Sequence, residues 1–357
     1  MKNLYFLLVV VFALSGCSGS ESAGTASGEE KGVLTLMTWN VCNLCDGVDD
    51  GIEYAEFKQS AGWTREKYMG RINAVSAAIR GLTPQPDILM LEEIESNVIL
   101  EDLAAALPKN YISCHFANNP KAAMGVGILS RLPLTEAKNH SITVDGETTP
   151  RPVLEARVQT EKGDIILFVC HFKSKLGGDE ATEKVRRSSV RVILRRIREI
   201  SDEEPDIGFI IAGDLNENYD EFYRQGSKAI SALIPDDPYC VKLSNENNGG
   251  QKEFLILTGK KPPLPVNFPQ ESIVLFSPWM SDLQNGTYYY KHNWETIDHF
   301  LISGHFFDGS DWEYEKVFIG NFEPFANSSG IPIPYSTKTG AGLSDHFPLI
   351  LTIKLLE

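Results

Sequence analysis

Apolar and polar residues follow two different periods along the chain, and together they predict a mixture of helices and strands. Apolar residues recur every three or four positions from Tyr68 to Ile79, which predicts a helix over 64–80 that ends at Gly81. The other predicted helices cover 97–107 and 180–200, and apolar runs predict strands over 35–41, 86–91, 111–116, 125–130, 153–159, 164–171, 207–212, 296–303, 315–319 and 347–355.

Residues 218–290 do not follow either period. They contain the breakers NENNGG (245–250) and KKPPLP (260–265), which predict a loop-rich region. Helices and strands are otherwise mixed in order, with no repeat and no linker after residue 32. We therefore expect one α/β domain over 33–357, with two mixed sheets packed face to face between helices.

The N-terminus carries an export pattern. Lys2 precedes an apolar run from Leu4 to Leu14, too short to span a membrane but typical of a signal peptide. The following Ser15-Gly16-Cys17 resembles a bacterial lipobox, in which Cys17 is lipidated; the alternative is an ordinary cleaved signal with a chance cysteine.

We therefore expect residues 1–16 to be a lipoprotein signal peptide. Residues 17–32, rich in Ser, Gly and Glu, would form a flexible tether. The mature protein would be exported and held to a bacterial membrane through its N-terminal lipid, on the periplasmic face or the cell surface.

The charge balance limits how the protein could bind polyanions. The chain has 33 basic and 48 acidic residues, a net charge of −15, which becomes −16 once Lys2 is removed with the signal peptide. A protein that holds DNA mainly by charge would be basic. Any contact with phosphates is therefore expected to be mediated by metal ions.

The cysteines indicate neither a disulfide framework nor a zinc site. Five follow Cys17, an odd number that argues against a complete disulfide framework. Cys42 and Cys45 have the CxxC spacing, but no second CxxC or histidine pair follows, so zinc binding is not expected. A local disulfide and two unreactive thiols both remain open.

Polar residues of catalytic type recur at the ends of predicted strands. They are Thr38-Trp39-Asn40, Leu91-Glu92-Glu93, His171-Phe172-Lys173, Gly213-Asp214-Leu215-Asn216, Ile297-Asp298-His299 and Ser344-Asp345-His346. Carboxylates and amides are hard ligands suited to Mg²⁺ or Mn²⁺, and histidines near such a metal can move protons. No GxSxG or GxxxxGK[ST] motif occurs, which disfavours a serine hydrolase or a nucleoside triphosphatase.

In this order the motifs resemble the endonuclease/exonuclease/phosphatase superfamily, which includes deoxyribonuclease I, exonuclease III and the sphingomyelinases. The resemblance runs from about Leu34 to the C-terminus. It implies a four-layer αββα sandwich of two mixed β-sheets flanked by helices. It also implies hydrolysis of a phosphoester by in-line attack of water, with Mg²⁺ or Mn²⁺ as the expected cofactor and Ca²⁺ as an alternative.

The resemblance assigns a role to each matching residue. Glu93 would bind the metal, with Asn40 beside it and Asp345 as a further contact. Asp214 would orient or deprotonate the attacking water, and Asn216 would contact a phosphate oxygen.

Two histidines complete the site that the resemblance implies. His171 would bind the scissile phosphate and stabilise charge near the leaving group. His346 would be a general base or a phosphate contact, and Asp298 would hold its tautomer. His299 would point to the opposite face of its strand and is not a site candidate.

Departures from the family pattern bear on the substrate. Abasic-site endonucleases carry Asp where this chain has Cys42 and favour Tyr near His171, so the resemblance is closer to secreted nucleases and phosphodiesterases. Lys173 and Lys175 are either phosphate contacts or a solvated strand end. We expect a monomeric, extracytoplasmic nuclease or phosphodiesterase that hydrolyses phosphodiester (or phosphomonoester) bonds, with nucleic acid as the expected substrate. The alternatives are a sphingomyelinase-like or inositol-phosphatase-like enzyme, and a non-catalytic surface-binding lipoprotein.

Overall fold

The computed structural model describes residues 32–108, 110–120, 122–224, 226, 231–247, 253–264 and 273–356. The predicted signal peptide, Cys17 and the tether up to residue 31 lie outside the described residues. None of the helices in the described part of the chain has the length and apolarity that crossing a bilayer requires.

Two large mixed sheets form the centre of the fold. The six-stranded sheet has the order β17 (Trp312–Ile319), β18 (Leu349–Leu355), β1 (Val33–Leu44), β2 (Ile88–Ile94), β4 (Gly125–Ser130) and β3 (Ser113–Ala117). The eight-stranded sheet has the order β11 (Leu233–Pro235), β12 (Leu255–Thr258), β13 (Val274–Phe276), β16 (Asp298–Ile302), β10 (Gly208–Asp214), β9 (Gly163–His171), β8 (Val153–Thr160) and β5 (Leu134–His140). In the centre of the sheets β1 and β2 are parallel, as are β9 and β10, whereas β16 runs antiparallel to β10.

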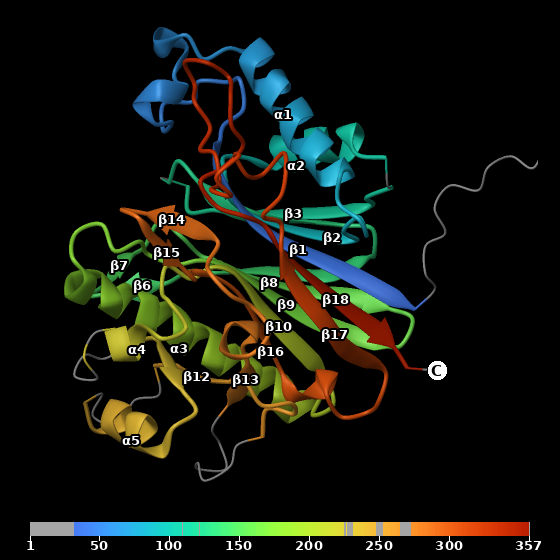
Figure 1. Cartoon of the computed structure of the whole chain (residues 1–357), viewed down its shortest axis with the longest axis vertical. Helices are drawn as coiled ribbons and strands as arrows, with labels where there is room; N and C mark the ends of the chain where they lie inside the picture. The colour runs from blue at the N-terminus through green and yellow to red at the C-terminus, as the bar shows by residue number, and fades with distance from the viewer. Residues whose placement is uncertain are drawn as a thin grey trace, which may run out of the picture. The chain divides into compact units, whose positions relative to one another are not determined.

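Helices cover the outer face of each sheet. Figure 1 shows α1 (Arg65–Arg80) and α2 (Asn97–Ala106) beside the first sheet and α3 (Asp179–Glu203) along the second. Alternation along the strands separates the cores: in β1, Leu36 packs between the sheets, whereas Met37 packs under the helices. The expected four-layer αββα sandwich is confirmed.

The long predicted elements agree with the structure, and the region 218–290 does not. The helix predicted over 64–80 is α1, and Thr64 caps it by accepting a hydrogen bond from the Lys67 N–H. The region predicted to be loop-rich supplies β11, β12 and β13, which extend the second sheet. It also holds α4 (Glu221–Arg224), α5 (Pro238–Asn247), a 3₁₀ turn (Pro278–Met280) and β14 (Tyr288–Tyr290).

The remaining elements are short. They are 3₁₀ turns at Ala55–Phe57, Gln59–Ala61 and Gly304–Phe306, the hairpin β6 (Thr143–Val144) with β7 (Glu147–Thr148), and β15 (Asn293–Glu295), which pairs with β14. Cys42 and Cys45 are free thiols, so the disulfide alternative is wrong. Burial, together with the Asp345 and Glu93 carboxylates, raises the pKa of the Cys42 thiol to about 12, which makes it unreactive.

Candidate active site

Strand alternation brings polar side chains together at one end of the space between the sheets. In β1, Leu36 faces the other sheet, so Asn40 faces it as well. The same alternation turns His171 at the end of β9, Asp214 at the end of β10 and Asp298 at the start of β16 toward the first sheet. Strand pairing sets Asp214 directly between His171 and Asp298.

Asp214 is buried and held by hydrogen bonds to both carboxylate oxygens. Its Oδ1 accepts from the Asn216 backbone N–H at 2.8 Å, and its Oδ2 accepts from Asn40 Nδ2 at 3.1 Å. Burial and the neighbouring Asp298 carboxylate raise the pKa of Asp214 to about 7. This carboxylate is therefore poised to exchange a proton near neutral pH.

His346 and Asp298 form a buried pair. His346 Nδ1 donates to Asp298 Oδ2 at 2.8 Å, and the Thr287 hydroxyl donates to the same oxygen at 2.5 Å. Burial lowers the pKa of His346, but Asp298 and the other nearby carboxylates outweigh it and hold that pKa well above its ordinary value. His346 is thus an imidazolium. Trp39 Nε1 donates a hydrogen bond to the His346 backbone carbonyl at 3.0 Å, and the Tyr288 ring stacks on the imidazole with ring centroids 4.6 Å apart.

His171 lies on the other side of Asp214. Its Nε2 is 3.5 Å from Asp214 Oδ2 and 3.7 Å from Glu93 Oε1. Burial, with positive charge nearby on Arg151, His346 and Lys173, lowers the pKa of His171 well below its ordinary value. The two histidines therefore differ in charge at neutral pH.

The predicted metal-binding residues border a turn at the end of β1. Glu93 has a φ of 61° at a bulge in β2, and its Oε2 accepts from the Asn43 N–H at 3.0 Å. Asn40 Oδ1 accepts from the Cys42 N–H at 3.0 Å. Half-buried Asp345 and Glu93 both act on the Cys42 thiol, so they flank the same turn.

Comparison with known proteins assigns the family. The sequence profile of the Endonuclease/Exonuclease/phosphatase family matches residues 35–243, more than half of the chain. The chain belongs to this family. Among curated proteins, none matches the sequence.

Solved structures share the fold of this family member at low sequence identity. Truncated TDP2 from Caenorhabditis elegans is 14% identical with a TM-score of 0.54, over 90% of this chain and 97% of that one. The endonuclease/exonuclease/phosphatase from Bacteroides vulgatus is 16% identical with a TM-score of 0.51, over 91% and 100%. A family protein from Leptotrichia buccalis is 14% identical with a TM-score of 0.50, over 91% and 100%.

Members of the endonuclease/exonuclease/phosphatase family are generally hydrolases of phosphoester bonds that use divalent metal ions, and the residues here fit such an ion. Glu93 Oε1 accepts no hydrogen bond from any described residue, and the Glu93 side chain is 19% exposed, so it is open to a ligand. Asn40 Oδ1 keeps a lone pair beyond its one hydrogen bond. Both are hard oxygen donors.

Three other residues at this site form a second acid–histidine group. One ligand atom from each of Asp214, Asp298 and His346 lies within 4.8 Å of the others. His346 Nδ1 already donates to Asp298, however, so this geometry is that of an ion pair beside a carboxylate.

Arg71 is a site-supporting residue that the sequence did not indicate. It comes from α1, is 2% exposed, and donates to the carbonyl oxygens of Val41, Cys42 and Asn43 at 2.5–2.6 Å. A longer bond of 3.4 Å reaches the Leu343 carbonyl, next to the Ser344–His346 loop. Arg71 therefore joins the end of β1, which carries Asn40, to the loop that carries Asp345.

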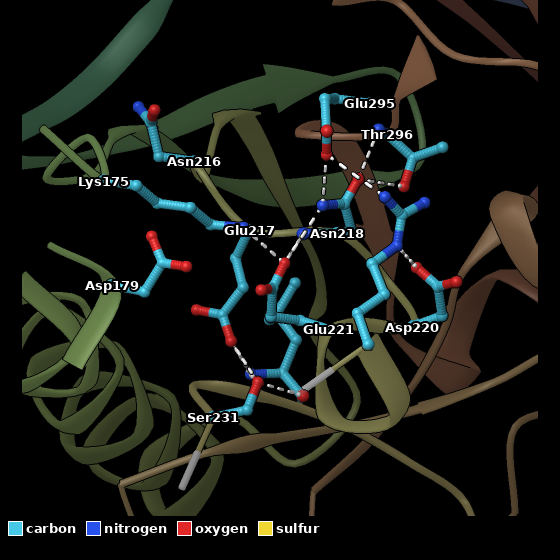
Figure 2. Close-up of polar contacts among 12 residues, drawn as sticks. Lys175, Asp179, Asn216, Glu217, Asn218, Asp220, Glu221, Ser231, Glu295 and Thr296 are labelled. Carbon is cyan, nitrogen blue, oxygen red and sulfur yellow. Dashed lines mark hydrogen bonds and ion pairs between the residues drawn. The ribbon is translucent and has the colours of Figure 1, made fainter. Parts of the chain in front are cut away.

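Asn218 is a second such residue, and Figure 2 shows its contacts. Its side chain accepts from the Thr296 N–H at 2.7 Å and donates to Glu221 at 3.0 Å and Glu295 at 2.6 Å. These bonds fix the loop after β10 to the segment that leads into Asp298. Asn216, in contrast, points away from this network, and its amide donates to the Phe172 carbonyl at 3.1 Å.

Two further expectations can be compared with the structure. Lys175 pairs with Glu221 at 2.6 Å, so it is neither a solvated residue nor an unpaired phosphate contact. His299 faces away from the site, as expected, and its Nε2 donates to the Glu217 carbonyl at 2.8 Å.

Proposed function

We propose that this family member is a divalent-metal-dependent phosphodiesterase that cleaves by in-line attack of water, with nucleic acid as its substrate class. The observation that supports this is the placement of Asp214 between a neutral His171 and a cationic His346, with Glu93 open beside them. The site thus brings together one proton acceptor, two histidine nitrogen donors and one carboxylate that can bind a hard metal ion.

Each side chain would act on a different atom of the substrate. Asp214 would take the proton of the attacking water, because its carboxylate is fixed by two hydrogen bonds and has a pKa of about 7. The His346 imidazolium, held by Asp298, would contact a phosphate oxygen. His171 would donate its Nε2–H to the phosphate near the leaving oxygen.

Glu93 and Asn40 would hold the divalent cation, with Asp345 within the same turn. When bound there, Mg²⁺ or Mn²⁺ would neutralise charge that develops on the phosphate. The cation also accounts for how a chain with a net charge of −15 could approach a polyanion.

A substrate panel tests the proposal. Purified protein with Mg²⁺ or Mn²⁺ should hydrolyse bis-p-nitrophenyl phosphate and DNA or RNA, in preference to p-nitrophenyl phosphate, sphingomyelin and inositol phosphates, and EDTA should abolish turnover. His346→Ala should lose at least about 100-fold in rate, whereas His115→Ala on the edge strand β3 should not. EDTA-resistant turnover, or unchanged turnover in His346→Ala, would refute it.

We also propose that the enzyme acts outside the cytoplasm, anchored through a lipid on Cys17. The support is the N-terminal sequence pattern. In the native cell the protein should incorporate labelled fatty acid and sediment with membranes, and Cys17→Ser should do neither. Equal labelling of both forms would exclude the anchor.

A further inference from the structure

A second group of carboxylates lies beside the candidate active site, in the loop between β1 and α1. Asp50 and Glu53 belong to this loop, and Glu95 follows the end of β2. One carboxylate oxygen from each lies within 4.8 Å of the others. None of the three takes part in the phosphoesterase site described above.

Burial makes this group more than an exposed acidic patch. Glu53 is 5% exposed and Glu95 is 6% exposed, whereas Asp50 is open to solvent. Glu95 Oε2 accepts from the Asp46 N–H at 2.7 Å, but the buried Glu95 Oε1 has no hydrogen-bond partner. A buried carboxylate oxygen without a partner is costly, and the Glu95 carboxylate lies within 4.8 Å of two others, so a cation is the partner that this place favours.

Among the described residues, backbone N–H groups are the donors to two of these carboxylates: Gly51 donates to Glu53 at 3.0 Å and Asp46 donates to Glu95 at 2.7 Å. No lysine or arginine in the described part of the chain forms an ion pair with Asp50, Glu53 or Glu95. Arg71, the buried arginine nearby, is committed to the backbone carbonyls at the end of β1. Like charges gathered in a partly buried place are destabilising unless a proton or a counter-ion neutralises them.

We propose that Asp50, Glu53 and Glu95 bind a structural Ca²⁺ ion. All three supply hard oxygen ligands, and the exposed side at Asp50 leaves room for the waters that complete a Ca²⁺ shell of six to eight oxygens. Mg²⁺ fits less well, because it demands near-ideal octahedral geometry and this set joins a flexible loop to a strand end.

The position of the ion explains what it would do. The Glu95 N–H donates to the Leu44 carbonyl at 3.1 Å, so the cluster lies where the ends of β1 and β2 meet. Those ends carry Asn40 and Glu93. Bound Ca²⁺ would hold the loop against the end of β2 and steady the turn that presents the catalytic metal ligands.

Calorimetric titration with Ca²⁺ tests the proposal without any activity measurement. Wild-type protein should bind one equivalent more than Glu95→Gln, and Ca²⁺ should raise the thermal midpoint of the wild type but not that of the variant. Asp50→Asn, on the exposed side, provides a second variant should Glu95→Gln fail to fold. Glu56→Gln, an exposed acid in the same segment, is the matched control and should bind as the wild type does.

A spectroscopic readout gives the location. Trp63 Nε1 donates to the Asp46 carbonyl at 2.7 Å, so excitation of this indole should sensitise Tb³⁺ bound in the cluster. Added Ca²⁺ should displace Tb³⁺ from the cluster and so remove part of the luminescence of the wild type. This Ca²⁺-sensitive part should be absent from Asp50→Asn and Glu95→Gln. It should be present in Glu93→Gln, whose altered carboxylate lies in the phosphoesterase site. Equal Ca²⁺ stoichiometry and affinity in wild type, Asp50→Asn and Glu95→Gln would overturn the proposal and leave the phosphoesterase function standing.

Discussion

Replacing Arg71 by Met should destabilise the protein and disturb the candidate active site together. The change leaves the carbonyls of Val41, Cys42 and Asn43 without their donor. A buried polar group that loses its partner costs about 1–3 kcal/mol. Cys42 and Asn43 are half-buried, so water can hydrate their carbonyls in the variant, and we take the lower end of this range, about 1 kcal/mol, for each of the three carbonyls. The free energy of unfolding should fall by about 3 kcal/mol.

The assay is equilibrium urea unfolding, combined with metal-dependent hydrolysis of bis-p-nitrophenyl phosphate. Arg80→Met is the matched control, because Arg80 lies on the same helix but is exposed and makes one bond, to the Ala106 carbonyl. Its effect should stay within about 0.5 kcal/mol. Arg71→Lys should be intermediate, since one ammonium cannot reproduce the guanidinium fork. An Arg71→Met protein within about 1 kcal/mol of wild type would refute the reasoning.

Three further predictions concern other parts of the fold. Gly213 has a φ of 127°, and an added Cβ would lie 2.0 Å from the Cys170 carbonyl oxygen of β9, so Gly213→Ala should abolish soluble expression. Gly178 has a φ of 103° but open space around it, so the control Gly178→Ala should cost only about 1–3 kcal/mol of stability in urea unfolding. Burial raises the pKa of Glu155, but Arg196 and His140 outweigh it and lower that pKa from 4.5 to about 2. This carboxylate therefore stabilises the fold above pH 4.5, and about 3 kcal/mol of stability should be lost as the pH falls toward 2; Glu155→Gln should remove that dependence in acid titrations of unfolding. Asn218→Ala should lower stability by about 3 kcal/mol and reduce kcat more than it changes KM, because it frees the segment before the Asp298 strand; unchanged kcat would contradict this positioning role.

The polar residues at the strand ends could be predicted because the signal for each lies in the few residues around it. Asn40, His171, Asp214 and Asp298 each end or begin an apolar run, and period-two alternation then determines which face they take. The long helices were predictable for the same reason, since α1 repeats its apolar residues over several turns.

The elements that were missed are short or depend on distant partners. β11 and β13 have three residues each, too few to show a period, and they form only because neighbouring strands supply hydrogen bonds. The sequence did not indicate Arg71 or Asn218, because a bond to a backbone carbonyl or amide leaves no pattern in the sequence.

The charge of His346 also required the structure. Sequence motifs left it as either a base or a phosphate contact, and the 2.8 Å bond to buried Asp298, with the other nearby carboxylates, favours the charged form. In the proposed mechanism the proton acceptor is then Asp214, whose pKa is raised by burial and by the same Asp298 across the β10–β16 pair.

Asp214→Asn removes the carboxylate that is proposed to activate water at the metal-dependent phosphodiesterase site. Its rate on bis-p-nitrophenyl phosphate with saturating Mn²⁺ should be compared with wild type, after circular dichroism shows the same fold. We expect a loss of about 10²–10⁴-fold, whereas Asp206→Asn, a change at an exposed acid, should leave the rate unchanged. A folded Asp214→Asn protein that keeps its rate within about tenfold of wild type would show that Asp214 does not activate the water.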